Sequence, residues 1–364
     1  MGITSLVLLC LGLVLMVAGA EALVRGASNL AIALGISPLI IGLTVVAYGT
    51  SSPEMAVSLQ STFAGHEAIS IGNVVGSNIF NVLFILGVSA SITPLLVAQQ
   101  LVKLDVPVMI GTSLLLLVLA LDQEIGRLDG ILLFSGAVAY TGFLFYQNSH
   151  EQKPETDSLQ PGCDDDQTQS EPSAKASWTK NLVFIGLGIV LLTVGSRLLV
   201  QGAVAIAEWI GLSQLVIGLT LISLGTSLPE VATSVVASIK GERDIAVGNV
   251  IGSNIFNILA VLGVAGILSP NGVDVSSAAL NFDIPVMIVV AIACLPIFFT
   301  GNVITRWEGA LFLGYYAAYT SYLILNAMNH ATLPIFSRIV IIFVIPLAMV
   351  TLVTVAFRHN SRRL

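Results

Sequence analysis

Long runs of apolar residues, separated by short polar stretches, extend along almost the whole chain. A helix that crosses a bilayer needs about 20 mostly apolar residues, and eleven runs approach or exceed that length. They cover roughly residues 3–33, 38–64, 69–97, 104–121, 128–147, 181–210, 214–239, 245–268, 279–299, 307–327 and 338–357. The pattern therefore predicts an all-α polytopic membrane protein with eleven transmembrane helices.

Composition agrees with this prediction. Of the 364 residues, 55% are hydrophobic and 10% are charged, whereas an average soluble domain carries about 25% charged residues. A large soluble enzyme and a disordered protein are therefore excluded. The formal net charge of −7 has the wrong sign for a nucleic-acid partner. The three cysteines lie far apart with no CxxC spacing, so they indicate neither a disulfide framework nor a zinc site.

The distribution of Lys and Arg predicts how the helices are oriented. If the N-terminus lies outside and the chain alternates through eleven spans, two basic loop residues, Arg127 and Arg338, fall outside. Ten fall on the cytoplasmic side: Lys103, Lys153, Lys175, Lys180, Lys240, Arg243, Arg306, Arg358, Arg362 and Arg363. We therefore expect a multi-pass protein of the cell (inner) membrane, with its C-terminus in the cytoplasm.

One long polar stretch, residues 148–180, divides the chain. It carries seven acidic residues and three lysines, which is typical of a solvated linker. A calcium-sensing loop is the alternative, but the spaced oxygen ligands of such a loop are missing. The sequence thus predicts four parts: a five-helix unit at 1–147, an acidic cytoplasmic linker at 148–180, a second five-helix unit at 181–327, and an extra helix with a basic tail at 328–364.

The two five-helix units are repeats of each other. Residues 42–87 align without a gap to residues 218–263, with 24 identities in 46 positions. Since five is odd, the second unit must enter the membrane from the opposite side. Two inverted repeats around an in-plane pseudo-two-fold axis are the architecture of many secondary transporters, so a transporter is the leading functional class.

Both repeats carry a glutamate about halfway along a predicted span. Glu54 and Glu230 end the repeated motif G-T-S-x-P-E. A carboxylate at that depth costs a few kcal/mol unless it is paired or binds a cation, and neither motif has a Lys or Arg nearby. The pseudo-axis should bring the two carboxylates together, so a bound cation is the expected partner.

The residues before each glutamate predict how the cation is held. Pro53 and Pro229 interrupt helix hydrogen bonding and free backbone carbonyls near Gly49–Thr50 and Gly225–Thr226. Such irregular backbone is tolerated at membrane depth where it lines a cavity. Carbonyls, hydroxyls and two carboxylates make an all-oxygen site, which suits Ca²⁺ and Na⁺ and does not suit zinc or copper.

A second repeated motif, G-N-x-x-G-S-N-I-F-N, begins at Gly72 and at Gly248. Its serine and final asparagine are four residues apart and share a helix face. We expect Ser77, Asn81, Ser253 and Asn257 to be ligands, and Asn73, Asn78, Asn249 and Asn254 to make helix-packing hydrogen bonds.

Two other pairs of charged residues have simpler interpretations. Asp105 and Asp283 each precede a proline at a helix start, which favours N-capping. Glu21 and Arg25 are four residues apart in the first helix and are expected to pair. The chain shows neither a nucleotide-binding glycine loop nor a nucleophile–base set, so it is not expected to be an enzyme.

With these paired motifs the sequence resembles the cation/Ca²⁺ exchanger superfamily, specifically prokaryotic sodium/calcium exchangers, over roughly residues 3–327. The resemblance implies that Ca²⁺ and Na⁺ compete for overlapping sites formed by helices 2, 3, 7 and 8, while helices 1 and 6 slide across this core. It implies Glu54 and Glu230 as the main ligands. Backbone carbonyls would come from Ala47, Thr50, Ser223 and Thr226, and hydroxyls from Ser51, Ser77, Ser227 and Ser253.

The chain also departs from some relatives. Some carry Asp where Asn257 stands, and Asn at both 81 and 257 argues against K⁺ co-transport. We therefore expect a Na⁺/Ca²⁺ antiporter that works by alternating access. The alternatives are Ca²⁺/H⁺ exchange or another divalent/monovalent exchange and, from a different class, a cation channel or a membrane calcium sensor. No cofactor beyond the transported ions and no obligate protein partner is indicated.

Overall fold

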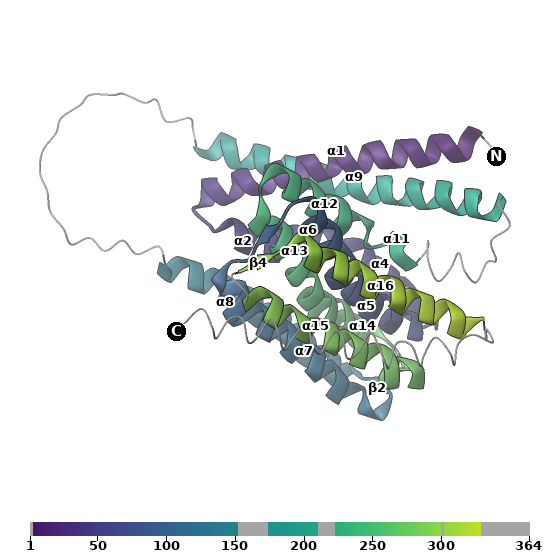
Figure 1. Cartoon of the computed structure of the whole chain (residues 1–364). Coiled ribbons are helices and arrows are strands. Elements are labelled where there is room, and N and C mark those ends of the chain that lie inside the picture. Colours follow the sequence, from purple (N-terminus) through teal and green to yellow (C-terminus); the bar gives the residue numbers. More distant parts are fainter. Residues whose placement is uncertain (1–2, 152–173, 210–222, 300–301, 329–364) are drawn as a thin grey trace, which may run out of the picture.

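The computed structural model describes residues 3–151, 174–209, 223–299 and 302–328, and these residues form a bundle of helices (Figure 1). Six of the described helices are long and apolar enough to cross a membrane. They cover Thr4–Leu34, Ala68–Ile92, Leu101–Asp122, Arg127–Asn148, Trp178–Trp209 and Arg243–Leu268. The predicted helical membrane protein is confirmed.

The second predicted span, 38–64, is a broken helix. It consists of α2 (Pro38–Ile41), the π-helical turn η1 (Gly42–Val46), α3 (Ala47–Thr50) and α4 (Ser52–Phe63). The break falls at Ser51, two residues before Pro53. The predicted interruption of this helix is therefore confirmed, since a proline lacks the amide hydrogen that would continue it.

The remainder of the first half contains four membrane-length helices. The first is α1 (Ile3–Leu34), the second joins α5 (Ala68–Phe80), η2 (Asn81–Ile85) and α6 (Leu86–Ile92), and the third joins η3 (Leu101–Asp105), α7 (Val106–Leu119) and η4 (Ala120–Asp122). The strand β1 (Leu95–Leu96) precedes η3, and the strand β2 (Glu124–Ile125) precedes α8 (Arg127–Glu151), the last helix of this half.

The second half repeats this order. It contains α9 (Ala174–Trp209), α11 (Ser223–Gly225), α12 (Leu228–Lys240), α13 (Arg243–Phe256), η6 (Asn257–Leu262), α14 (Gly263–Leu268), β3 (Val273–Asp274), η7 (Ala279–Asp283), α15 (Ile284–Phe299), β4 (Val303–Ile304) and α16 (Arg306–Ala327). The break between α11 and α12 falls at the position that corresponds to the break between α3 and α4. The predicted eleventh helix, most of the 148–180 linker and residues 210–222, which include the start of the seventh span, lie outside the described residues.

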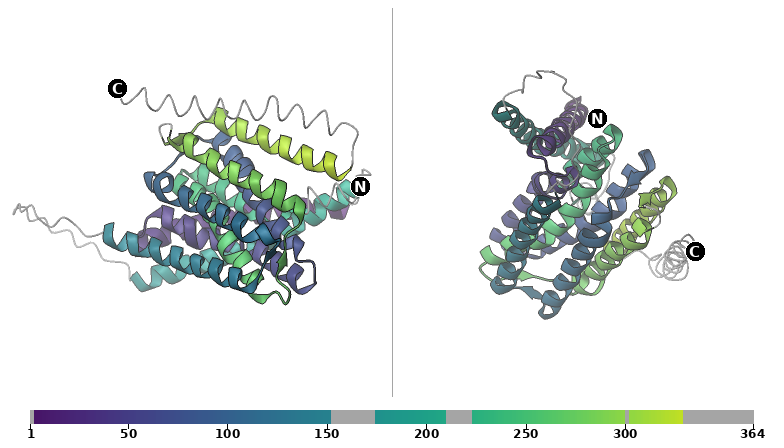
Figure 2. Two further views of the ribbon diagram at one scale, coloured as in Figure 1. Left: turned by 90° about the horizontal axis from the view of Figure 1, so that it is seen from below. Right: turned by 90° about the vertical axis from the view of Figure 1, so that its left-hand side faces the viewer.

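The two longest helices, α1 and α9, lie side by side along one flank of the bundle (Figures 1 and 2). Their glycines permit close contact. A Cβ atom on Gly12 would lie 2.7 Å from the carbonyl oxygen of Gly195, and one on Gly195 would lie 2.8 Å from that of Gly12. Small residues that let backbones approach are the usual basis of helix association in membranes.

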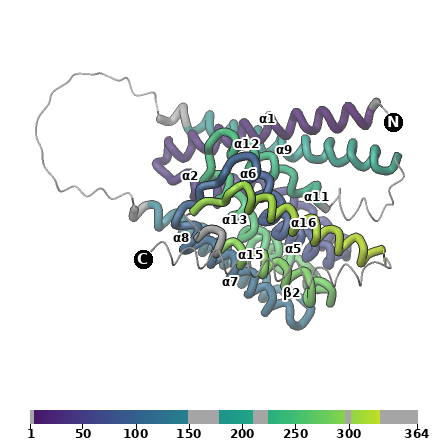
Figure 3. Tube along the Cα trace, viewed as in Figure 1, coloured from purple at the N-terminus to yellow at the C-terminus, as the bar shows by residue number. Residues whose placement is uncertain are grey.

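The buried core lies between the two halves. Helices α5 and α13 are its centre, and their apolar residues form one cluster with those of α7 and α15. Helix α8 packs against α14 and η6 of the second half, whereas α16 packs against α6 and η2 of the first (Figure 3). The short strands cross over in the same way, because β1 pairs with β4 and β2 pairs with β3, both antiparallel.

Two predictions about charged residues are wrong. Glu21 does not pair with Arg25, because its carboxylate binds Lys240 Nζ of α12 at 2.7 Å, while Arg25 lies over the Phe184 ring. Asp105 does not cap α7: the π-helical turn η3 runs directly into α7, and the Asp105 carboxylate accepts a hydrogen bond from Tyr140.

Asp283 repeats this arrangement. It stands between η7 and α15, and its carboxylate accepts a hydrogen bond from Tyr319 at 2.9 Å. The reason is the same in both halves. Each helix begins before its aspartate, at Leu101 and at Ala279, so the backbone amides that an N-cap would satisfy already have helical partners.

Candidate functional site

The two helix breaks place a glutamate at the start of a helix in each half. Glu54 lies in the first turn of α4 and Glu230 in the first turn of α12. Both residues have 0% exposed surface. A helix N-terminus favours a negative charge, and the two carboxylates lie close enough for the charge of Glu230 to act on Glu54. The structure thus brings together the two residues that the sequence singled out.

Each glutamate is held by a serine of the other half. Ser51 Oγ donates a hydrogen bond to Glu230 Oε1 at 3.0 Å, and Ser227 Oγ donates one to Glu54 Oε1 at 2.8 Å. Ser227 Oγ also lies 2.9 Å from Ser77 Oγ. These bonds are reciprocal between equivalent residues, as expected when two repeats face each other across a pseudo-two-fold axis.

A second reciprocal pair joins the threonines of the breaks to asparagines. Thr50 donates to Asn249 Oδ1 at 3.0 Å, and Thr226 donates to Asn73 Oδ1 at 3.3 Å. The amide of Asn73 also donates to Ser58 Oγ. The predicted packing role of Asn73 and Asn249 is therefore confirmed.

Four asparagines cross-link α5 and α13 at the centre of the bundle. Asn81 Nδ2 donates to Asn254 Oδ1 at 3.0 Å, and Asn257 Nδ2 donates to Asn78 Oδ1 at 3.1 Å. Asn78 and Asn254 also bond each other's backbone carbonyl oxygens. The packing role predicted for Asn78 and Asn254 is confirmed, and the same bonds fix the orientation of Asn81 and Asn257.

Several buried oxygens of this region have no hydrogen-bond partner among the described residues. They are Glu54 Oε2, Glu230 Oε2, Asn81 Oδ1, Asn257 Oδ1 and Ser253 Oγ. Leaving a buried polar atom unpaired costs about 1–3 kcal/mol, and more for a charged group, so each of these atoms calls for a partner that is not a protein donor. In the described part of the chain, no cluster of three or more His, Cys, Asp and Glu is present. The donor set is therefore two carboxylates with neutral oxygens.

The remaining candidate residues differ in their surroundings. The carbonyl oxygen of Ala47 accepts from the Ser51 amide at 3.0 Å and lies 3.3 Å from Thr50 Oγ1. The helix break therefore does not free the carbonyl oxygen of Ala47, which keeps its hydrogen-bond partners within the protein. Ser223 is the first residue of α11, and its side chain lies outside the described residues.

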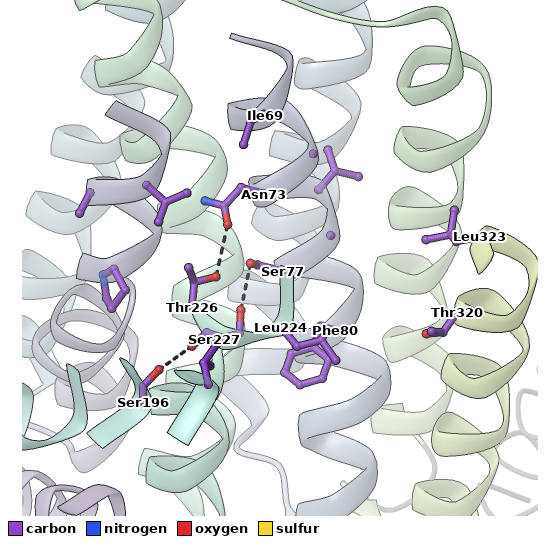
Figure 4. Close-up of a pocket in the computed structure, with 18 of the residues that line it drawn as sticks. Ile69, Asn73, Ser77, Phe80, Ser196, Leu224, Thr226, Ser227, Thr320 and Leu323 are labelled. Atoms are coloured by element: carbon purple, nitrogen blue, oxygen red, sulfur yellow. Dashed lines mark hydrogen bonds between the residues drawn. The ribbon is translucent and has the colours of Figure 1, made fainter. Parts of the chain in front are cut away.

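A pocket of about 730 Å³ reaches the site from one side. Figure 4 shows Asn73 and Ser77 of α5 facing Thr226 and Ser227 across it, with the hydrogen bonds that join each pair. Its wall includes parts of α4, α9 and α16. Asp283 also lines it, so this carboxylate stands on the route to the site.

The equivalent surface on the other side is closed. Gly72 of α5 is exposed, whereas its counterpart Gly248 of α13 is buried. A Cβ atom on Gly248 would lie 3.0 Å from the carbonyl oxygen of Leu39, because α2 and η1 cover α13 here. Among the described residues, which do not include 210–222, the site is therefore accessible from the α5 side and closed on the α13 side.

Two pairs of residues around the site were not singled out from the sequence. Ser58 and Ser234 support the packing asparagines. Each follows a site glutamate by four residues, so helical spacing was the available signal. The hydroxyls of Tyr140 and Tyr319 bind Asp105 and Asp283, and no local spacing connects those pairs.

Comparison with known proteins identifies the family and the fold of the chain. The sodium/calcium exchanger protein family matches residues 4–146 and 180–325. The chain is 42% identical over 294 residues to the putative antiporter CaxA of Alkalimonas amylolytica, covering 80% of this chain and 89% of that protein. It is 35% identical over 341 residues to the sodium/calcium exchanger MaX1 of Methanosarcina acetivorans, covering 86% and 97%.

Solved structures of the sodium–calcium exchanger NCX_Mj have the same fold. One of them, soaked with 2.5 mM Na⁺ and 1 mM Sr²⁺, superposes with a TM-score of 0.74 at 30% identity and covers 88% of this chain and 99% of that chain. The family match spans both repeats and the helices that carry both glutamates. The chain belongs to the sodium/calcium exchanger family, a family of membrane antiporters.

Proposed function

We propose that this exchanger is a Na⁺/Ca²⁺ antiporter, and that Ca²⁺ and Na⁺ bind in turn between α4, α5, α12 and α13. The observation that carries the proposal is the set of buried oxygens without hydrogen-bond partners among the described residues, contributed by both repeats around Glu54 and Glu230. Oxygen-only coordination by six to eight flexible ligands is what Ca²⁺ requires.

The proposed ligands fall into three groups. Glu54 and Glu230 neutralise the charge, and Asn81 and Asn257 supply amide oxygens whose orientation the asparagine network supports. The remaining ligands are the hydroxyls of Ser51, Ser77, Ser227 and Ser253 and the backbone carbonyls of Ala47, Thr50, Ser223 and Thr226. The carbonyl oxygen of Ala47 would then bind the cation while it also accepts hydrogen bonds from the Ser51 amide and the Thr50 hydroxyl.

Charge balance explains why such a site exchanges ions instead of leaking them. Two carboxylates neutralise one Ca²⁺, so the loaded site is nearly neutral and can be enclosed. The empty site holds two buried charges, and burying unpaired charge is costly. The protein therefore changes conformation when it is loaded and resists doing so when it is empty.

The pseudo-symmetry supports alternating access. The open pocket along α5 and the packed surface along α13 occupy equivalent places in the two repeats. If the two repeats exchanged these arrangements, the pocket along α5 would close and a pocket along α13 would open. With the orientation predicted from Lys and Arg, the open pocket faces outside and the closed side faces the cytoplasm. The proposed location is the inner membrane, which is supported by the name of a relative, the inner membrane protein YrbG of Escherichia coli, 38% identical over 285 residues.

The choice of Na⁺ as the coupling ion rests on the relatives that are named sodium/calcium exchangers. Ca²⁺/H⁺ exchange is the alternative, because two carboxylates can bind protons as well as cations. We propose that the transported ions are the only bound ligands required, with no cofactor and no obligate protein partner.

The test is ⁴⁵Ca²⁺ uptake into proteoliposomes loaded with Na⁺, with K⁺, or at a lower internal pH. Uptake driven by internal Na⁺ supports the proposal, and uptake that responds only to the proton gradient assigns Ca²⁺/H⁺ exchange instead. Uptake that needs no counter-ion indicates a channel. Glu54→Gln and Glu230→Gln should each abolish exchange, since one charge cannot neutralise Ca²⁺. Glu124→Gln, an exposed carboxylate in β2, is the matched control.

A further inference from the structure

A second pocket lies between α1 and α9, away from the cation site. Its volume is about 340 Å³, and its wall includes Arg25 and Asn29 of α1 and Lys180, Asn181 and Phe184 of α9. These residues come from the C-terminal half of α1 and the beginning of α9, which run in opposite directions. The pocket therefore joins the two long helices near one end of the pair.

The pocket is positively charged. Arg25 and Lys180 both line it, and among the described residues that line it there is no Asp or Glu. The nearest acid on α1, Glu21, forms its ion pair with Lys240, and Arg25 lies 5.9 Å from the centre of the Phe184 ring. Stacking on an aromatic ring restricts a guanidinium group while leaving its N–H donors available.

A buried amide adds an independent observation. Asn181 lines the pocket with 5% of its surface exposed, and its Nδ2 atom has no hydrogen-bond partner among the described residues. A buried donor without a partner costs free energy, so this amide requires an acceptor. With the guanidinium and the ammonium, it makes three donor groups that face one space and suit an anion with several oxygens.

The surroundings indicate the source of that anion. Trp178, with 46% of its surface exposed, lies two residues before Lys180, and exposed tryptophans are typical of the lipid headgroup level. Further toward the middle of the helix pair, exposed apolar side chains share a face with the pocket residues. Val14 lies three turns from Arg25, and Leu187 lies two turns from Lys180; their exposed fractions are 62% and 49%.

We propose that this pocket binds the phosphate group of an anionic phospholipid. The phosphate oxygens would accept hydrogen bonds from Arg25, Lys180 and Asn181, while the acyl chains lie along the exposed apolar face of α1 and α9. Basic pockets between transmembrane helices are suited to acidic headgroups. A lipid bound in this way bridges the two long helices at one end.

The test uses the full-length protein in a neutral detergent, with bound lipid counted by native mass spectrometry and the melting temperature measured in parallel. Phosphatidylglycerol should bind and raise the melting temperature, whereas phosphatidylcholine should do neither. Inorganic phosphate and glycerol 3-phosphate separate a free anion from a lipid. If they stabilise the protein as well as phosphatidylglycerol does, the lipid assignment is overturned. Neither readout involves Ca²⁺ or Na⁺, so the result is independent of the proposed transport function.

Variants locate the binding. A basic residue near an acidic membrane surface contributes about fivefold to affinity, so Arg25→Gln and Lys180→Gln should each weaken phosphatidylglycerol binding about fivefold. Asn181→Leu, which removes the buried donor at similar volume, should also weaken it. Lys103→Gln, an exposed lysine far along the chain, is the control of equal charge. Equal weakening by Lys103→Gln, or no weakening by Lys180→Gln, overturns the proposal. If Arg25→Gln fails to fold, two other variants still test the proposal. Lys180→Gln, at an exposed position, should weaken binding, and Arg25→Lys should retain it.

Discussion

Ser227 of the second repeat donates a hydrogen bond to the carboxylate of Glu54 in the first repeat, at 2.8 Å. The equivalent bond runs from Ser51 to Glu230 at 3.0 Å. Each repeat thus positions the other's charge, and neither half of the site is complete alone. This reciprocity gives a reason for a close-fitting pair of repeats if the protein opens on two sides in turn, as proposed above.

The two serines should therefore be equivalent in their effect on transport. Ser51→Ala and Ser227→Ala each remove one hydrogen bond to a buried carboxylate, which is worth about 0.6–1.5 kcal/mol and corresponds to a roughly three- to tenfold change in affinity. We expect each variant to raise the apparent KM for Ca²⁺ in ⁴⁵Ca²⁺ uptake by that factor. Ser135→Ala, at an exposed position of α8, is the control. An unchanged KM in both variants would contradict the assigned geometry.

Ca²⁺ exchange should also depend on pH through competition at the site. Protons and Ca²⁺ bind the same oxygens of Glu54 and Glu230, and Ca²⁺ is neutralised only when both carboxylates are ionised. As the pH falls below neutral, the apparent KM for Ca²⁺ should rise, while the maximal rate at saturating Ca²⁺ should change little. Initial rates of Na⁺-driven uptake, measured with equal pH on both sides of the membrane, check this. A falling maximal rate with constant KM would place the titrating group outside the site.

The repeat explains why the site was predictable from the sequence. The motifs around Glu54 and Glu230 occur twice at one offset, so the sequence itself contains the information that two distant segments are equivalent. The helix break near Pro53 was also predictable from the sequence, because it has a local cause, the missing amide hydrogen of proline. In the second motif the four-residue spacing places Ser77 and Asn81 on one helix face, but Asn73 lies four residues before Ser77 and shares that face, so spacing alone does not separate packing from ligand asparagines. The ligand role of Asn81 and Asn257 stays a prediction.

The features that were missed depend on how helices cross. Glu21 binds Lys240, 219 positions away, and nothing in its local sequence distinguishes that partner from Arg25. The pairing of Asp105 with Tyr140 required knowing that η3 continues into α7. The one-sided pocket was not predictable either, since the same motif packs differently around α5 and α13 among the described residues.

That difference in packing leads to a prediction for glycine. A Cβ atom on Gly252 would lie 2.5 Å from the carbonyl oxygen of Leu43, whereas one on its counterpart Gly76 would meet no described atom within 4 Å. Gly76→Ala should fold with a normal melting temperature. If the repeats exchange conformations, the added methyl group would then clash in the opposite state, at a cost of about 1–3 kcal/mol, and would lower the population of that state roughly 5- to 150-fold.

Exchange by Gly76→Ala should therefore be strongly reduced, although the protein is folded. Gly142→Ala in α8, where a Cβ atom also meets no described atom within 4 Å, is the control and should transport normally. Normal exchange by Gly76→Ala would mean that α5 never adopts the packing of α13, which contradicts alternation by exchange of conformations.

The ion pair between Glu21 and Lys240 should bias the protein toward the conformation described here. It links α1 to the end of α12, on the closed side, and Ser28 of α1 adds a hydrogen bond to Glu242 nearby. At the equivalent positions the second repeat has Arg197 and the first has Ala64, so the open side lacks this ion pair. Both side chains are partly exposed, at 59% for Glu21 and 35% for Lys240, and such pairs are weak.

Glu21→Lys should therefore shift the population toward the opposite opening by about two- to fivefold. The measurement is the labelling rate of Ile69→Cys, which lies in the open pocket, by a membrane-impermeant maleimide in a protein without its three native cysteines. Labelling should slow in Glu21→Lys and recover in the charge-reversed double variant Glu21→Lys/Lys240→Glu. If the double variant labels as slowly as Glu21→Lys alone, the effect comes from the added lysine itself, and the ion pair does not hold the inner side closed.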